Sequence, residues 1–282
     1  MDMRYHIEYY AENTYEFPFL EAHWQFLIEP MNGSGQRVLS FHFENSAKAP
    51  WEHSHNAFDF QVLRVRSRIP IRHIEFRAIF ELEKAPVNPY DFDLDAIIPL
   101  PSEPERLLAF RVANNRFLRE TDLTRLPETA IPYAFDPHQN IFQNLMGLNR
   151  WTYEALHYRE GVTHTGTSLA EILLKPEGVC QDFAHLFIGM ARYNGIPSRY
   201  VSGYLHQGHG HFGDTHMHAW AESFVPGIGW IGFDPTNNLL TATDHVKVAH
   251  GRDYKDCAPL KGVIFGQGTN TTSHKVQVSS QQ

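Results

Sequence analysis

Three side chains of this sequence are of the types that carry out nucleophilic acyl transfer: Cys180, His218 and Asp234. This chemistry needs a thiol whose proton is taken by an imidazole, and a carboxylate that fixes the tautomer of the imidazole and stabilises its protonated form. The three residues occur in the words GVCQDFAH, HMHAW and GWIGFDPTN. Because they are far apart along the chain, folding must bring them together.

The segment that begins at Cys180 is predicted to form a buried helix. Apolar residues recur at helical spacing from Cys180 to Ala191, and Asn194-Gly195 is a typical helix end. The N-terminal end of a helix offers partial positive charge and free N–H donors, which favour a thiolate and can stabilise an oxyanion. The alternative is an inert core residue, because cysteine is among the most buried residue types.

His218 and Asp234 are predicted on two neighbouring strands. MHAWAESFV and GWIGFDPT have strand-like patterns, which place His218 on one strand and Asp234 at the end of the next. Two antiparallel strands can present these side chains next to each other, facing the start of the Cys180 helix. Taken singly, His218 could be an ordinary residue among 18 histidines, and Asp234 could simply form a turn before Pro235.

Composition limits the classes of function. The 24 basic and 32 acidic residues give a formal charge of −8 without a polybasic run, which argues against nucleic acid as a partner. We find neither a secretory signal nor an apolar run of about 18 residues, so we expect a cytoplasmic protein with no membrane partner. Cys180 and Cys257 are the only cysteines, which excludes a disulfide framework and predicts free thiols.

The 282 residues are predicted to form two domains. Alternating apolar and polar residues up to about position 90 predict an antiparallel β domain over residues 1–98. Helical signals follow in residues 99–282: a segment at 105–119, a longer one that opens at Asp136-Pro137, and a capping box in which Glu171 follows Ser168 by three residues.

The words GVCQDFAHLFIGMARYNGIPSRYVSGYL, HAWAESFVPGIGWIGFDPTNN and HVKVAHGRDYKDCAPLKGVIFG together carry a family resemblance. Over roughly residues 160–265 the chain resembles the bacterial transglutaminase-like family of candidate cysteine peptidases. The resemblance implies an α+β fold: an N-terminal antiparallel β domain, then a papain-like core in which the cysteine helix packs on an antiparallel sheet. It also implies Cys180 as the nucleophile, His218 as the base and Asp234 as the orienting residue.

The function expected from this reading is a cysteine-dependent acyl-transfer enzyme that hydrolyses a peptide or amide bond, with a peptide or protein as substrate. Neither a cofactor nor a metal is expected. The alternative from another class is a non-catalytic protein-binding module that retains the fold and uses the β domain to recruit a partner.

A metal site is the other alternative. Gly210, His216, His218, Glu222 and Gly229 have the spacing of the first cupin motif, and imidazole and carboxylate ligands suit Zn, Fe or Mn. The second half of that motif is missing, and the helical region of 105–194 does not suit a small β-barrel. We therefore interpret the spacing as a chance match.

Four further residues and one loop complete the expectations. We expect Asp182 to be a first-turn carboxylate that complements the helix dipole, and Trp220 and Trp230 to wall the site and exclude water. Cys257 is expected to be structural. Three histidines of the glycine-rich loop could bind a metal loosely, but a solvated loop is preferred; they are His206, His209 and His211.

Overall fold

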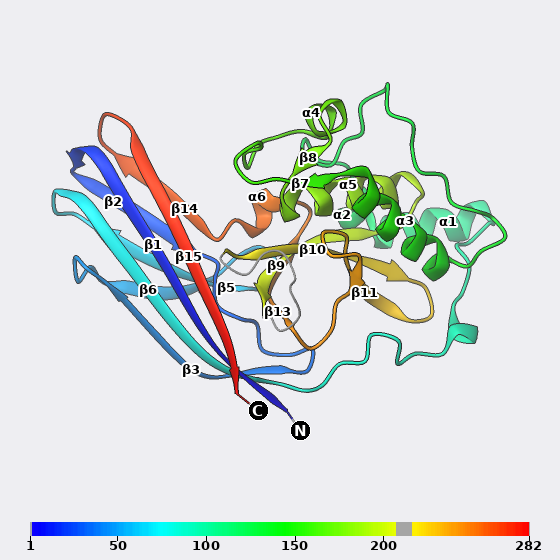
Figure 1. The fold of residues 1–282 in the computed structure, drawn as a ribbon, viewed down its shortest axis with the longest axis horizontal. Coiled ribbons are helices and arrows are strands. Elements are labelled where there is room, and N and C mark those ends of the chain that lie inside the picture. The colour runs from blue at the N-terminus through cyan, green and yellow to red at the C-terminus, as the bar shows by residue number, and fades with distance from the viewer. Residues whose placement is uncertain (1, 207–215, 282) are drawn as a thin grey trace.

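The computed structural model describes residues 2–206 and 216–281, and it has the mixed α+β class that the sequence predicts. Two parts lie next to each other: a β part made of antiparallel strands, and a mixed part in which helices cover a sheet (Figure 1). Both ends of the chain lie in the β part. Within the described residues, no helix is long and apolar enough to cross a membrane.

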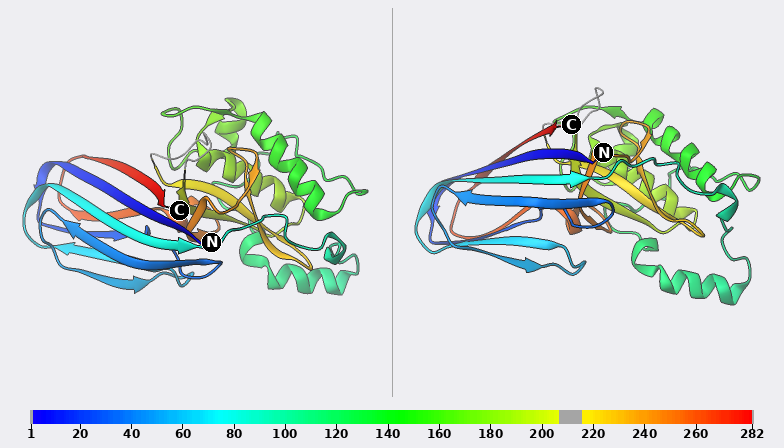
Figure 2. Two further views of the ribbon diagram at one scale, coloured as in Figure 1. Left: turned by 60° about the horizontal axis from the view of Figure 1, so that its bottom comes forward. Right: turned by 90° about the horizontal axis from the view of Figure 1, so that it is seen from below.

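Among the described residues, the β part has eight strands in two sheets. Figure 2 shows the two sheets from two further directions. The bounds of the strands are β1 Met3–Phe19, β2 Glu21–Phe26, β3 Gln36–Asn45, β4 Trp51–His55, β5 Gln61–Ser67, β6 Ile71–Lys84, β14 Leu260–Phe265 and β15 Asn270–Gln281. The first sheet has the order β15-β1-β6-β3, and the second has the order β14-β2-β5-β4.

Alternation along the strands builds the core between these sheets. In β1 every second residue from Tyr5 to Tyr15 is buried, as expected for a strand with one face against a core. The rings of Phe26 in β2 and Phe76 in β6 lie 4.8 Å apart, so the two sheets pack face to face. Full burial of such a side chain stabilises the fold by about 1.5–3 kcal/mol.

The last strands correct the predicted domain limits. The sequence analysis assigned residues 99–282 to a single second domain. The structure instead pairs β14 with β2 and β15 with β1, with partners from Arg4↔Gln281 to Tyr15↔Asn270. The C-terminal segment therefore returns to the β part, because its alternating residues complete an edge of each sheet that no earlier segment covers.

The mixed part contains the remaining elements. They are the 3₁₀ turn η1 Leu94–Ala96, the helices α1 Pro104–Ala113, α2 Asn115–Leu118, α3 Ile141–Ala155, α4 Leu169–Leu174, α5 Cys180–Tyr193 and α6 Tyr254–Cys257, and the strands β7 His157–Tyr158, β8 Glu177–Gly178, β9 Ser198–Leu205, β10 His218–Val225, β11 Gly229–Asp234, β12 Leu239–Leu240 and β13 His245–Gly251. Five strands form one antiparallel sheet in the order β12-β11-β10-β9-β13.

Helix α5 packs on this sheet and against α3 (Figure 1). Phe187 of α5 is fully buried and stacks on Phe233 of β11 with ring centroids 5.3 Å apart. Burial of almost every residue of α5 holds the helix rigidly over β9 and β10. The start of this helix is thereby fixed relative to the strands that carry His218 and Asp234.

The helix limits partly match the sequence patterns. Helix α4 has the predicted capping box, in which the Ser168 hydroxyl and the Glu171 carboxylate cap each other's backbone N–H. The segment at 105–119 divides into α1 and α2 at Asn114. Helix α3 begins at Ile141 rather than near Asp136, because the side chain of Asn140 caps the helix there.

Candidate active site

Cys180 is the first residue of α5, as predicted, and its side chain is partly exposed. The helix starts here because Asp182, in its first turn, accepts a hydrogen bond from the Val179 N–H at 2.8 Å and another from the Thr163 hydroxyl at 2.7 Å. Gly178 allows this carboxylate to lie close: a Cβ at that position would be 2.5 Å from Asp182 Oδ2. These contacts agree with a structural role for Asp182.

The first turn of α5 presents backbone donors next to the thiol. The N–H groups of Asp182 and Phe183 bond to the Val179 carbonyl, whereas those of Cys180 and Gln181 have no acceptor among the described residues. Free N–H groups at a helix start carry partial positive charge and can bind an anion. This end of the helix can therefore stabilise negative charge beside the sulfur.

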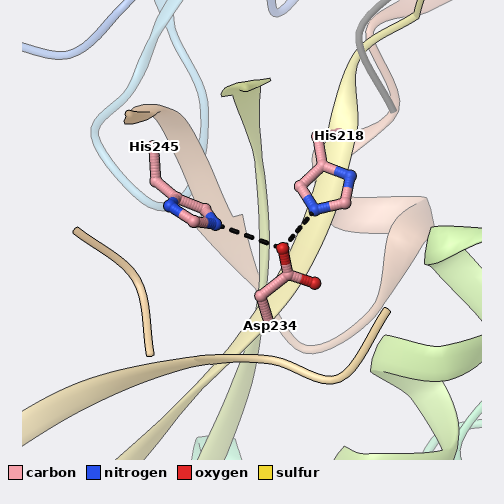
Figure 3. A group of neighbouring side chains, drawn as sticks. All are labelled: His218, Asp234 and His245. Carbon is pink, nitrogen blue, oxygen red and sulfur yellow. Dashed lines mark hydrogen bonds and ion pairs between the residues drawn. The ribbon is translucent and has the colours of Figure 1, made fainter. Parts of the chain in front are cut away.

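His218 and Asp234 form a buried pair on the sheet (Figure 3). His218 Nε2 lies 2.8 Å from Asp234 Oδ2, and the two residues are 1% and 0% exposed. The register of β10 and β11 pairs Ala221 with Phe233, so both members of the pair lie on the face of the sheet opposite to that of Phe233. The strands thus bring together two residues that the sequence placed on separate elements.

A tight turn fixes the carboxylate of Asp234. Its Oδ1 accepts the Thr236 N–H at 3.0 Å and the Asn237 N–H at 3.3 Å, and its Oδ2 accepts the Asn237 side-chain amide at 2.8 Å. This is the turn that Asp-Pro sequences favour. The turn-forming role and the pairing with His218 are therefore performed by the same residue.

His245 is a site residue that sequence reasoning missed. It begins β13, and its Nε2 lies 3.2 Å from Asp234 Oδ2, the same oxygen that binds His218 (Figure 3). Nδ1 of His245 accepts the Ala242 N–H at 3.3 Å, so Nε2 carries the proton and donates to Asp234. The segment HVKVAHG belongs to the family resemblance and could have pointed to His245. It contains two histidines and no clear strand boundary, so the sequence does not show which of them reaches the site.

Burial and charge shift the pKa values of this group in different directions. Burial lowers the pKa of His218, but the charge and hydrogen bond of Asp234 outweigh it, and the net pKa of His218 is raised. Burial raises the pKa of Asp234, but His218 and then His245 bring it below its usual range. The pKa of His245 is lowered, mainly by burial. The three-residue group therefore favours an imidazolium at His218, a carboxylate at Asp234 and a neutral imidazole at His245.

Asp234 engages one of the two ring nitrogens of His218 and leaves the other unbound. Nε2 is engaged by Asp234, and the buried Nδ1 meets no described group at full hydrogen-bond geometry. Cys180 nevertheless contributes to the raised pKa of His218, through a hydrogen bond and through its charge. The thiol is therefore close enough to His218 to stabilise the protonated imidazole.

The cluster of His218, Asp234 and His245 has hydrogen-bond geometry. Among the described residues it is the group whose ligand-type atoms come within 4.8 Å of one another. The 2.8 Å between His218 Nε2 and Asp234 Oδ2 is shorter than the spacing of about 3.4 Å that two ligands at 2.0–2.1 Å from one tetrahedral ion would have. The protons on both Nε2 atoms account for the arrangement.

The cupin-like reading does not fit the described residues. Both oxygens of Glu222 bind Lys247 Nζ, at 2.7 and 2.6 Å, and Oε2 also binds Arg199 Nε at 2.6 Å. Glu222 thus neutralises two cations, and its pKa is about 2 because their charges outweigh its burial. His216 is exposed and precedes β10, and Gly210 lies outside the described residues.

The remaining predicted residues have varied positions. The Trp220 ring is buried, 6.2 Å from that of His218 and 5.4 Å from that of His245, as expected for a wall. Trp230 instead stacks on the Arg199 guanidinium at 4.0 Å, towards the other end of β10. Cys257 is fully buried, and burial raises the pKa of its thiol well above the usual value.

The glycine-rich loop is described in part. His206 Nδ1 lies 3.4 Å from Asp244 Oδ1, and the ring of His206 contacts that of Tyr5. His209 and His211 lie outside the described residues. The preference for a solvated loop over loose metal binding therefore stays a prediction.

Comparison with known families supports the resemblance seen in the sequence. Residues 134–235 match the model of the transglutaminase-like superfamily, a range that includes Cys180, His218 and Asp234 but neither His245 nor the β part. An uncharacterised protein of Mycobacterium tuberculosis is 39% identical over 168 residues, which are 56% of this chain and 52% of that protein. One of Mycobacterium leprae is 40% identical over 134 residues, which are 46% of this chain and 47% of that protein. The chain thus spans about half the length of these curated relatives.

One solved structure shares the whole architecture. A candidate cysteine protease from Cytophaga hutchinsonii superposes with a TM-score of 0.71, covering 100% of this chain and 92% of that protein at 20% sequence identity. At this identity the likeness shows the fold alone. It extends the similarity in fold from residues 134–235 to the β part.

Proposed function

We propose that this chain is a cysteine-dependent acyl-transfer enzyme that hydrolyses a peptide or amide bond, with Cys180 as nucleophile, His218 as base and Asp234 as the orienting carboxylate. The observation that carries the proposal is the buried 2.8 Å pair of His218 and Asp234, in which Nδ1 of the imidazole has no partner among the described residues. Supporting it, the thiol stands at a helix start and is partly exposed, so a substrate can reach it.

The reaction would follow from the protonation states that the site favours. His218 Nδ1 takes the proton of the Cys180 thiol, and the sulfur attacks the carbonyl carbon, so that a C–S bond forms and the carbonyl oxygen becomes an oxyanion. His218 then gives the proton to the leaving amine as the C–N bond breaks. Asp234 holds the ring in one tautomer and stabilises its positive charge throughout.

The thioester that remains would be resolved by water. His218, now neutral, takes a proton from the water while the water oxygen attacks the thioester carbon. The C–S bond then breaks, and His218 gives the proton to the Cys180 sulfur as it leaves. The N–H groups of Cys180 and Gln181 would stabilise both oxyanions, because they have no acceptor among the described residues. Hydrolysis is the outcome that needs no second substrate besides water.

Alkylation of the thiol tests this proposal directly. An ordinary thiol, with a pKa of about 8.5, reacts slowly with iodoacetamide near pH 6, whereas a cysteine paired with an imidazolium reacts as thiolate. We expect Cys180 to label rapidly near pH 6 and to slow by at least about tenfold in His218→Ala. Peptide mass spectrometry distinguishes Cys180 from the buried Cys257, which serves as the internal control.

Equal and slow labelling of Cys180 in the parent and in His218→Ala would reject an activated thiol and favour the binding-module alternative. If Cys180 is activated, trapping of a thioester on Cys180 with peptide or amide substrates identifies the bond that is cleaved. The thioester should be absent in Cys180→Ala.

A further inference from the structure

We propose that His245 is a positioning residue for Asp234, and that the β part of the chain holds His245 in place through Lys84. The role rests on the proposed function, because Asp234 is there the residue that orients the base. It gives the β part a task within the active site, beyond any recruitment of partners.

The first step of the argument is the demand of a buried carboxylate. Asp234 is 0% exposed, so its charge must be stabilised by hydrogen bonds rather than by water. Its Oδ2 accepts hydrogen bonds from His218 of β10 and His245 of β13, at 2.8 and 3.2 Å. Without His245, this buried oxygen would keep the bonds to His218 and to the Asn237 amide but would lose its third hydrogen bond.

The second step is the fixed tautomer of His245. The Ala242 N–H donates to its Nδ1, which forces the proton onto Nε2 and directs it at Asp234. Burial keeps this imidazole neutral, because it lowers the pKa of His245. His245 is therefore a donor that adds no competing positive charge next to His218.

The third step is the origin of the support for His245. Lys84, at the end of β6, is 5% exposed, and its Nζ donates to the carbonyl of Ala242 at 2.9 Å and to the carbonyl of His245. The ammonium thus holds both residues that determine the position and tautomer of the His245 ring. Burial lowers the pKa of Lys84 to about 8, so its placement at these carbonyls has a cost that the rest of the fold must offset.

A second residue of the β part fixes the same strand. The side-chain amide of Gln36 in β3 donates to the Lys247 carbonyl at 2.7 Å and accepts the Lys247 N–H at 3.0 Å. Both backbone groups of a residue two positions after His245 are thereby bound to the β part. The start of β13 is consequently fixed by β3 and β6, two strands of the β part.

Substitutions at His245 separate hydrogen bonding from packing. His245→Gln keeps an N–H at about the place of Nε2, whereas His245→Leu removes it. His250→Leu is the matched control, since His250 lies on the same strand but contacts Arg199 and the Phe60 ring rather than Asp234. We expect alkylation of Cys180 near pH 6 to slow by about tenfold in His245→Leu and by less than about threefold in His245→Gln and His250→Leu.

The link to the β part is tested by Lys84→Met in the full chain. We expect a slowing in the same direction, of about three- to tenfold. Equal slowing in His245→Gln and His245→Leu would overturn the positioning role, because packing alone would then explain the effect. Parent-like rates in both His245→Leu and Lys84→Met would overturn it as well.

A spectroscopic readout separates this inference from the proposed function. The ring Nε2–H resonance of His218 in NMR spectra reports the hydrogen bond to Asp234 whether or not the chain cleaves any peptide. We expect this resonance to shift or broaden in His245→Leu and to be restored in His245→Gln. An unchanged resonance in His245→Leu would overturn the inference, even if Cys180 proves fully reactive.

Discussion

His218 and His245 donate to one and the same oxygen of Asp234, although they begin strands β10 and β13, which are not neighbours in the sheet. The two imidazoles differ in charge preference: the pKa of His218 is raised, chiefly by Asp234, and that of His245 is lowered, chiefly by burial. The carboxylate therefore has one partner suited to proton transfer and one suited to holding it in place.

Replacement of Asp234 by Asn tests the orienting role. The amide keeps the size of the side chain but loses the negative charge, so the His218 imidazolium is no longer stabilised and the wrong tautomer becomes accessible. We expect the rate of Cys180 alkylation near pH 6 to fall by about 10²-fold or more, in line with the large losses seen when a triad carboxylate becomes an amide. A rate within threefold of the parent would exclude this role.

The same variant should change how stability depends on pH. The folded pKa of Asp234 lies below its ordinary 3.8, so its stabilisation is present above that pH and is lost as pH falls. The folded pKa of His218 lies above its ordinary 6.5, so its stabilisation is full below pH 6.5 and declines as pH rises towards the folded value.

Urea unfolding at pH 3.5, 5.5 and 8.5 checks this expectation. The parent should be most stable relative to Asp234→Asn at pH 5.5, between the ordinary pKa values of 3.8 and 6.5. Each unit of pH below 3.8 or above 6.5 should lower this stability difference by up to about 1.4 kcal/mol per titrating group. A constant difference between the two proteins at all three pH values would contradict the coupling of the pair.

Glu222 should matter for stability rather than for the thiol. Its carboxylate binds Arg199 and Lys247 in a mostly buried position. Glu222→Gln leaves two cations without a counter-charge, and we expect the free energy of unfolding to fall by about 3–5 kcal/mol. The rate of Cys180 alkylation in the folded variant should remain near that of the parent. If Glu222 instead bound a metal, elemental analysis would find stoichiometric metal in the parent and none in Glu222→Gln.

Strand β15 offers a test of the corrected domain limits. Val276 is 3% exposed inside the β part, whereas its neighbour Gln277 points outward. Val276→Asp buries an unpaired carboxylate and should destabilise the chain by several kcal/mol, while Gln277→Asp should stay within about 0.5 kcal/mol. Similar unfolding midpoints for the two variants would mean that residues 270–281 do not pack into the β part.

Local patterns predicted much of this structure. The helix start at Cys180, the capping box at Ser168 and the strands that carry His218 and Asp234 all agree with the sequence analysis. Each depends on spacing over a few residues, which the chain itself records. The break at Asn114 was not predicted, since the apolar pattern continues through it.

The sequence by itself determined which residues could react, the class of the fold and the resemblance that links them to one family. Only the tertiary structure decided that residues 260–281 close the first two sheets, that Glu222 serves Arg199 and Lys247, and that His245 completes the shell of Asp234. The physical reason is that strand pairing and buried-charge compensation join residues far apart in the chain, such as Lys84 and His245, which are 161 positions apart. No local periodicity encodes which partner a strand or a charge will find.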